Sequence, residues 1–285
     1  MRRLLPLLVA FIAFSAACGG SSTGPSDPPP PPPNNALPVV TSIFVKGTLA
    51  REPAQYATLG ETVNVTATVT DAETPATQLT YEWSSTVGGT FAGNAATTTW
   101  TAPATLPGTT PTNATLTLTV TERVDATHNN RVTATTVVDL HNSPKEVGDL
   151  ARQFLLDFSA QLPVDQIMRN FTITCPEAAN ERGDVAASNE RFDIIDSQIG
   201  DAVTTVPFTG TCPYRLVSGD ACAQVPVYWR AKEKATGAVG ATRGTDQVTA
   251  LLENGTWKLC ASDYDYITTT GDTGLALLMN RRYRQ

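Results

Sequence analysis

The sequence is poor in charged residues, in basic clusters and in long apolar runs, and each shortage excludes a class of protein. Charged residues make up 16% of the 285 positions, so uncharged polar side chains must cover much of the surface, as in many secreted β-proteins. The net charge of −7 contains no internal basic cluster, which argues against nucleic-acid binding. No apolar run approaches the roughly 20 residues that cross a bilayer.

Sequence motifs for catalysis and metal binding are also missing. There is no Gly-x-Ser-x-Gly elbow, no phosphate-cradling glycine loop and no His-Glu-x-x-His helix. The two histidines, His128 and His141, lie in loop-like contexts, where a surface or linker role is expected. No cysteine pair has the two-residue spacing of a zinc knuckle. We therefore predict no catalytic residue, no metal site and no cofactor.

The beginning of the chain carries a targeting signal. Arg2 and Arg3 precede an apolar run over residues 4–14, and small residues then lead to Cys18. This order describes a secretory signal. The cysteine after small residues resembles the lipobox of bacterial lipoproteins, in which the cysteine becomes the lipidated first residue. The resemblance implies a signal peptide and lipobox over residues 1–18 and a membrane anchor through lipid on Cys18. An ordinary secretory signal cut nearby is the alternative.

Residues 19–36 consist largely of Gly, Ser, Pro and Asn, including six consecutive prolines at 28–33. Such a composition cannot bury a core, and it predicts a disordered tether. The proline run favours extended polyproline II, which suits a passive spacer.

Residues 37–141 are predicted to be a domain of β-strands. Apolar and polar residues alternate with a period of two, as in Val63, Val65 and Ala67 against Thr62, Asn64 and Thr66. Several short strands without a helical pattern predict an antiparallel two-sheet sandwich. The candidate strands are 39–47, 61–70, 78–85, 96–101, 113–122 and 131–140.

Four short segments of this domain carry a family resemblance. They are Asp71, Leu79-Thr80-Tyr81-Glu82-Trp83, Gly88-Gly89-Thr90-Phe91 and Trp100-Thr101-Ala102-Pro103. Together they look like bacterial immunoglobulin-like domains of the polycystic-kidney-disease-repeat type. The resemblance implies an all-β immunoglobulin-like sandwich with Trp83 in its core, acting as a spacer or adhesive unit.

Residues 143–285 are predicted to form a second domain, which begins with helices. Ser143 and Glu146 fit a capping box, with Pro144 at the first helical position. Apolar residues from Val147 to Leu162 fall on one helical face, which predicts a helix over 144–161. A second short helix is expected over 164–171.

Strand patterns fill the remainder of the second domain. Gly200-Asp201 predicts a hairpin of 192–199 with 202–209, and a helix over 184–199 is the alternative. Alternation from Val225 to Ala231 indicates another strand. Asn254-Gly255 predicts a type I′ turn joining 244–253 to 256–265, with Leu252 facing Trp257 and Ala250 facing Leu259.

Helices followed by an antiparallel sheet with the run Glu253-Asn254-Gly255-Thr256-Trp257-Lys258-Leu259 resemble the nuclear transport factor 2-like superfamily. The resemblance implies an α+β domain whose curved sheet forms a ketosteroid-isomerase-like cone around the first helix. Relatives hold small apolar ligands there, and some isomerise or cyclise them with Asp, His or Tyr. The residues expected to line a cone are Phe154, Phe158, Tyr228, Trp229, Trp257 and Tyr264. The alternative is that the large aromatic side chains simply fill the core.

Four cysteines remain if Cys18 carries lipid, and an even number in an exported chain predicts disulfides. Three pairings are open. We favour Cys212 with Cys222, because they bracket a short segment with little to bury. Cys175 then pairs with Cys260, which the segment after the second helix can reach.

These features predict a lipid-anchored protein of the bacterial cell envelope, at the outer membrane or cell surface rather than the inner membrane. Its expected role is non-catalytic binding, adhesion or structure, with the membrane as one partner and an envelope protein or polysaccharide as another. The alternative is a carrier of small apolar ligands, or an isomerase or cyclase, that uses the cone of the C-terminal domain.

Overall fold

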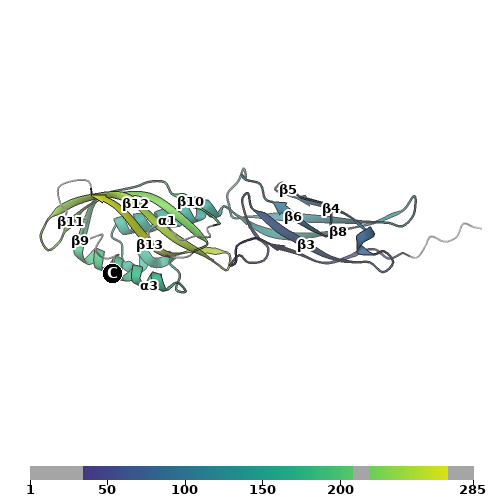
Figure 1. Cartoon of the computed structure of the whole chain (residues 1–285), viewed down its shortest axis with the longest axis horizontal. Coiled ribbons are helices and arrows are strands. Elements are labelled where there is room, and N and C mark those ends of the chain that lie inside the picture. Colours follow the sequence, from purple (N-terminus) through teal and green to yellow (C-terminus); the bar gives the residue numbers. More distant parts are fainter. Residues whose placement is uncertain (1–34, 208–218, 269–285) are drawn as a thin grey trace, which may run out of the picture. The chain divides into compact units, whose positions relative to one another are not determined.

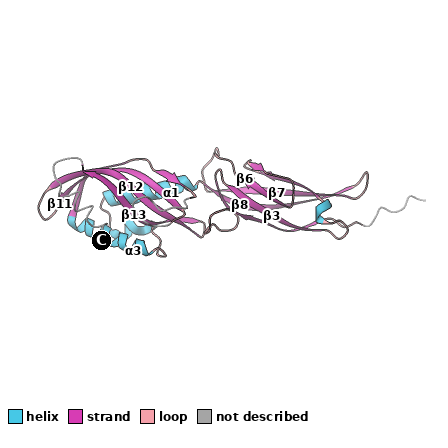
Figure 2. Cartoon of the chain, in the orientation of Figure 1, coloured by secondary structure: helices cyan, strands magenta, loops and turns pink. Residues whose placement is uncertain are grey.

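The computed structural model describes residues 35–207 and 219–268, with only the backbone path for 264–268 (Figure 1). The predicted signal peptide, Cys18 and nearly all of the tether lie outside the described residues, as does Cys212. The chain is mostly β-sheet, as predicted (Figure 2). We call residues 36–141 the first region and residues 142–268 the second region.

The first region consists of two four-stranded sheets. All six predicted strands are present. The structure adds two short strands, β2 (Tyr56–Thr58) and β5 (Thr90–Phe91), which are too short to show an alternating pattern in the sequence. Neighbours are antiparallel, except that β2 runs parallel to β8. The first sheet has the order β1 (Val39–Lys46), β3 (Thr62–Thr70), β6 (Thr97–Thr101), β5 (Thr90–Phe91). The second has the order β2 (Tyr56–Thr58), β8 (Asn129–His141), β7 (Thr112–Arg123), β4 (Thr80–Ser85).

The alternating residues of both sheets meet in one shared core. Trp83 and Trp100 are buried in it, and each indole N–H donates to a backbone carbonyl, of Ala95 at 2.9 Å and of Gly88 at 3.1 Å. Since a buried polar group needs a partner, these bonds let both rings serve as core residues. The opposite faces carry rows of threonine, with Thr117 across from Thr135 as one example.

The second region places three α-helices and one 3-10 turn before a five-stranded antiparallel sheet. Helix α1 contacts β11 and β13, and α3 contacts β13 and β9. The sheet runs β10, β11, β12, β13, and β9 also pairs with β11. The helices are α1 (Ser143–Ser159), α2 (Val164–Ile167), the 3-10 turn η2 (Met168–Asn170) and α3 (Pro176–Arg191). The strands are β9 (Phe192–Ile199), β10 (Val203–Thr205), β11 (Ala221–Glu233), β12 (Val239–Glu253) and β13 (Thr256–Thr268).

The predicted hairpin of 192–199 with 202–209 is wrong. Strands β9 and β10 do not pair with each other, because both run antiparallel to β11 and follow one another along its edge. At the break the Gly200 N–H donates to the Pro226 carbonyl at 2.8 Å, and the Arg152 side chain donates to the Gly200 carbonyl at 2.9 Å. Gly200-Asp201 therefore spans an interruption in one edge strand.

Two details of the helices also differ from the predictions. The N-cap of α1 is Asn142 instead of Ser143: its side chain accepts from the Lys145 N–H, and Glu146 accepts from the Asn142 N–H. The shift by one residue leaves Ser143 buried inside the first turn. The start of α3 was not predicted. The alternative helix over 184–199 is right for 184–191, which belong to α3, and wrong for 192–199, which form β9.

The hairpin of β12 and β13 is confirmed with its register. Leu252 faces Trp257 and Ala250 faces Leu259. Asn254 and Gly255 both have positive φ, 50° and 78°, as a type I′ turn requires. A bulge next to Ala250 adds one residue to β13, at Cys260.

Residues at the end of the first region join the core of the second. Leu49 and Tyr56 belong to the cluster that α1 forms with β11, β12 and β13. The Tyr56 ring is 1% exposed and stacks on His141 with 4.5 Å between centroids, and its hydroxyl lies 3.0 Å from Ser143 Oγ. Residues from Ala36 onward accordingly cluster as one compact unit.

Polar contacts reinforce this junction. Arg51 donates to Asp220 at 3.1 Å, and the same carboxylate accepts from the Leu252 N–H at 2.9 Å. In the loop that carries Arg51, burial and the adjacent Glu61 carboxyl raise the pKa of Glu52 to about 8. Glu52 is thus neutral at pH 7, which allows it to lie beside Glu61.

We expect Tyr56→Ala to destabilise both regions together, because the ring belongs to a core that they share. Loss of a buried aromatic side chain costs about 3–5 kcal/mol, whereas Tyr56→Phe loses only a hydrogen bond worth about 1 kcal/mol. Urea denaturation gives the free energies, and hydrogen exchange in β7 and β12 reports each region. Reduced protection confined to β7 would contradict the coupling.

Candidate functional site

The candidate site predicted from the sequence is the inner face of the five-stranded sheet of the second region, the face that packs against α1. Buried residues from α1 and from alternate positions of β11, β12 and β13 form one cluster there. Phe154, Phe158, Trp229 and Trp257 all belong to it, and each is at most 3% exposed. Four of the six predicted lining residues therefore come together.

These aromatic rings pack on one another and on their neighbours. Phe158 meets Trp229 edge-to-face with 5.4 Å between centroids, and Phe154 meets Phe171 in the same way at 5.0 Å. The Trp229 indole N–H donates to Ser159 Oγ at 2.8 Å. Such contacts are typical of a filled core, in which each large apolar side chain contributes about 1.5–3 kcal/mol on burial.

The other two predicted lining residues do not join this cluster. Tyr228 alternates with Val227 and Trp229 on β11, so its side chain lies on the outer face of the sheet, where Arg243 approaches its ring. Tyr264 pairs with Asp246 across β13 and β12, but its side chain lies outside the described residues. A strand period of two accounts for the misplacement of Tyr228.

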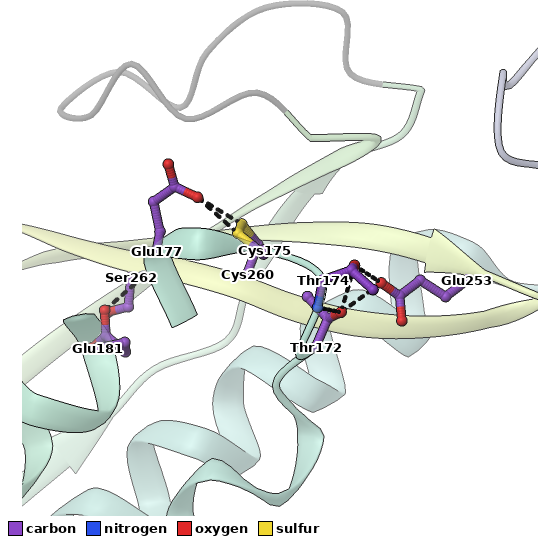
Figure 3. The surroundings of a disulfide bond; sticks show 8 residues. All are labelled: Thr172, Thr174, Cys175, Glu177, Glu181, Glu253, Cys260 and Ser262. Carbon is purple, nitrogen blue, oxygen red and sulfur yellow. Dashed lines mark hydrogen bonds between the residues drawn. A yellow bond between two sulfur atoms is a disulfide. The ribbon is translucent and has the colours of Figure 1, made fainter. Parts of the chain in front are cut away.

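A polar group occupies the inner face beyond the aromatic residues. Asp246 lies on the same face of β12 as Val248 and Ala250 and is fully buried. Its Oδ1 accepts from Ser262 Oγ at 2.8 Å, and Glu181 of α3 accepts from the Ser262 N–H at 3.1 Å (Figure 3). Burial raises the pKa of Asp246 well above its usual range, and the charges of Glu181 and Asp263 raise it further. Its surroundings therefore favour the protonated, neutral form of Asp246.

Sequence reasoning missed Asp246 and Glu181, although a signal for the first was present. The correct register put Ala250 and Leu252 on one face, and two-residue steps back along β12 lead from Ala250 to Asp246. Glu181 belongs to the start of α3, which was not predicted, so no sequence pattern placed it beside the sheet.

Cys175 and Cys260 form a disulfide, as predicted, with 5.6 Å between their Cα atoms. It ties the start of α3 to the bulge in β13, and Thr172 and Thr174 beside it hydrogen-bond to Glu253 (Figure 3). In the chain-entropy model a loop closed by cysteines 85 positions apart contributes about 4.6 kcal/mol. Cys222 is disulfide-bonded as well, but Cys212 lies outside the described residues, and the pairing of these two stays a prediction.

The disulfide also decides how Glu177 can be interpreted. Ligand atoms of Cys175, Glu177 and Cys260 lie within 4.8 Å of one another, close enough for a metal. The form of cysteine that binds metal is the thiolate. In the disulfide neither sulfur is a thiolate, so the cluster is a covalent link and offers no cation site.

The expectation that His141 is a surface or linker residue is half right. It ends β8 at the junction but is only 6% exposed. Its Nδ1 lies 2.9 Å from Glu146 and its Nε2 lies 3.1 Å from Asp139. Burial alone would lower the pKa of His141, but these two carboxylates outweigh it and raise the pKa. With both ring nitrogens facing carboxylates, the surroundings of His141 favour its charged form. His128 is exposed in a turn beside Asp125.

Comparison of the chain with protein-family models, with curated proteins and with solved structures gives no match. Within the part of the chain that the structure describes, none of the helices combines the length and apolar composition needed to span a bilayer.

Asp246→Asn should change how stability depends on pH. The folded chain holds the Asp246 proton to a higher pH than the unfolded chain, so wild-type stability falls as pH rises above the ordinary pKa of 3.8. Asparagine can still accept from Ser262 but does not titrate. The variant should match wild type in acid and exceed it increasingly towards neutral pH. Urea denaturation across pH tests this.

Asp196→Asn, at an exposed position on β9, is the matched control. Parallel stability curves for wild type and Asp246→Asn over the whole pH range would show that Asp246 is not held neutral.

Proposed function

We propose that this protein is a lipid-anchored component of the bacterial cell envelope with a non-catalytic binding, adhesion or structural role. The first region acts as an immunoglobulin-like spacer of the polycystic-kidney-disease-repeat type. The second region is a nuclear transport factor 2-like α+β domain whose inner face supports the fold. The partners are the membrane, through lipid on Cys18, and an envelope protein or polysaccharide.

The packing of the inner face carries the non-catalytic part of this proposal. Phe154, Phe158, Trp229 and Trp257 occupy the position where a ligand-binding relative would keep a cavity. The disulfide between Cys175 and Cys260 supports export, because structural disulfides persist in oxidising compartments. The residues before Cys18 support the anchor.

The alternative function is a carrier of small apolar ligands, or an isomerase or cyclase, that uses the inner face. Asp246 favours it, because a buried neutral carboxyl can donate a hydrogen bond or transfer a proton. The aromatic packing favours the non-catalytic role. The non-catalytic role predicts that no small ligand binds on the inner face, whereas the alternative predicts that one does.

We expect the wild-type chain to bind no small apolar ligand, such as benzene, on its inner face. Phe158→Ala should open a cavity there, lower stability by about 3–5 kcal/mol and create a binding site. Thermal shift and ligand-observed NMR measure both effects. Phe44→Ala, at a half-exposed position on β1, is the control. Stoichiometric binding by wild type, lost in Asp246→Asn, would favour the alternative.

Cys18→Ser should abolish lipid attachment and release the protein from membranes. Metabolic labelling with a radioactive fatty acid, followed by membrane fractionation, measures both. Ser22→Ala is a control, because it changes a residue close to Cys18 in the sequence and leaves the cysteine in place. Equal membrane retention of wild type and Cys18→Ser would contradict the lipoprotein proposal.

A further inference from the structure

The five-stranded sheet of the second region carries a groove of about 460 Å³ on its outer face, the face turned away from α1. This volume is within the typical size of ligand sites. The groove lies over β9, β11 and β12. The lining residues are Gln198, Gly200, Pro226, Val227, Tyr228, Arg243, Gly244 and Thr245.

The break in the edge strand and the small residues around it account for the hollow. At the break Gly200 packs against the Pro226 ring, and a Cβ on Gly200 would come within 3.2 Å of it. On β12, Arg243 faces Tyr228 and Thr245 faces Pro226, so both carry their side chains on this outer face, one on each side of Gly244. The groove is therefore built into the backbone of three strands.

The charge of the groove lining differs from that of the whole chain. None of the described lining residues is acidic, although the whole chain has a net charge of −7. Arg243 is exposed, and its guanidinium lies 5.9 Å from the centroid of the half-buried Tyr228 ring. Gln198, Tyr228 and Thr245 add neutral hydrogen-bonding groups. The groove thus offers one cation, one aromatic ring and several groups suited to hydroxyls.

None of the residues directly across from Arg243 in the register is acidic, whereas other cations of this face have an acidic residue across from them. Arg230 and Lys232 continue the same face of β11, and the register places Asp196 and Asp193 of β9 across from them. Arg243 instead faces Tyr228 and the backbone of Ile267. Among the described side chains, no carboxylate forms an ion pair with Arg243, and its guanidinium is exposed at the groove.

We propose that this groove binds a carboxylate-bearing sugar, of the kind that repeats in acidic polysaccharides. The Arg243 guanidinium takes the carboxylate, because its planar fork matches that group. Gln198, Thr245 and the Tyr228 hydroxyl contact the sugar hydroxyls, and the Tyr228 ring packs on the sugar. A phosphate ligand fits less well, since Arg243 is the one cation among the described lining residues. The inference rests on the binding role proposed above and names its ligand class.

Isothermal titration calorimetry on the purified full chain tests the inference, with oligogalacturonate as the probe. Oligogalacturonate should bind, and a neutral glucose oligomer of equal length and inorganic phosphate should not. Arg243→Gln should weaken binding about tenfold or more, as expected for one lost charge-assisted hydrogen bond. Tyr228→Ala should weaken it too. Arg131→Gln, at an exposed site on β8, is the matched control and should leave binding unchanged.

Absence of binding to oligogalacturonate, equal binding of the neutral oligomer, displacement by equimolar phosphate, or full affinity in Arg243→Gln would each overturn the sugar site. Circular dichroism of each variant checks that the fold is intact. The readout does not involve Cys18, so failure here leaves the membrane-anchor proposal to its own test. If oligogalacturonate binds but Cys18→Ser stays in the membrane fraction, the sugar site stands and the membrane-anchor proposal fails.

Discussion

The packing of α1 on the inner face of the five-stranded sheet is the interaction on which the rest of the structure depends. Its buried residues from Val147 to Phe158 contact β11 and β13, and the helix begins two residues after β8 ends. This packing therefore also draws the end of the first region, with Tyr56, into the same core. Because packed side chains fill the inner face, we expect a ligand from solvent to contact the outer face and its groove.

Local patterns in the sequence predicted much of the fold. The six long strands of the first region, α1 and the β12–β13 hairpin all followed from periodicity and turn residues, because one face of each element is buried. The order of β9 and β10 could not be predicted in this way, since it depends on their common partner β11. The start of α3 was missed because only a few residues of this helix are buried, among them Ala178 and Val185, and the disulfide of Cys175 anchors it.

The candidate site was predicted in part. The sequence brought Phe154, Phe158, Trp229 and Trp257 together, because helix and strand periods point them to a common core. It assigned Tyr228 to the wrong face, and it overlooked Asp246 because a carboxyl in a strand is ordinarily solvated. The resulting sheet has two chemically distinct faces, aromatic and closed on one side, polar and hollowed on the other. That division supports a binding role for the outer face.

Two of the buried carboxyls, those of Glu52 and Asp246, have a consequence for the charge of the whole molecule. The composition counts seven more acidic than basic groups, with histidine neutral. The pKa of Glu52 is about 8 and that of Asp246 lies well above its usual range, so the fold favours the protonated form of both. Folding therefore takes up protons from neutral solution, and the native chain migrates in an electric field as a less acidic molecule than its composition indicates. An anionic ligand that approaches the groove meets correspondingly less repulsion.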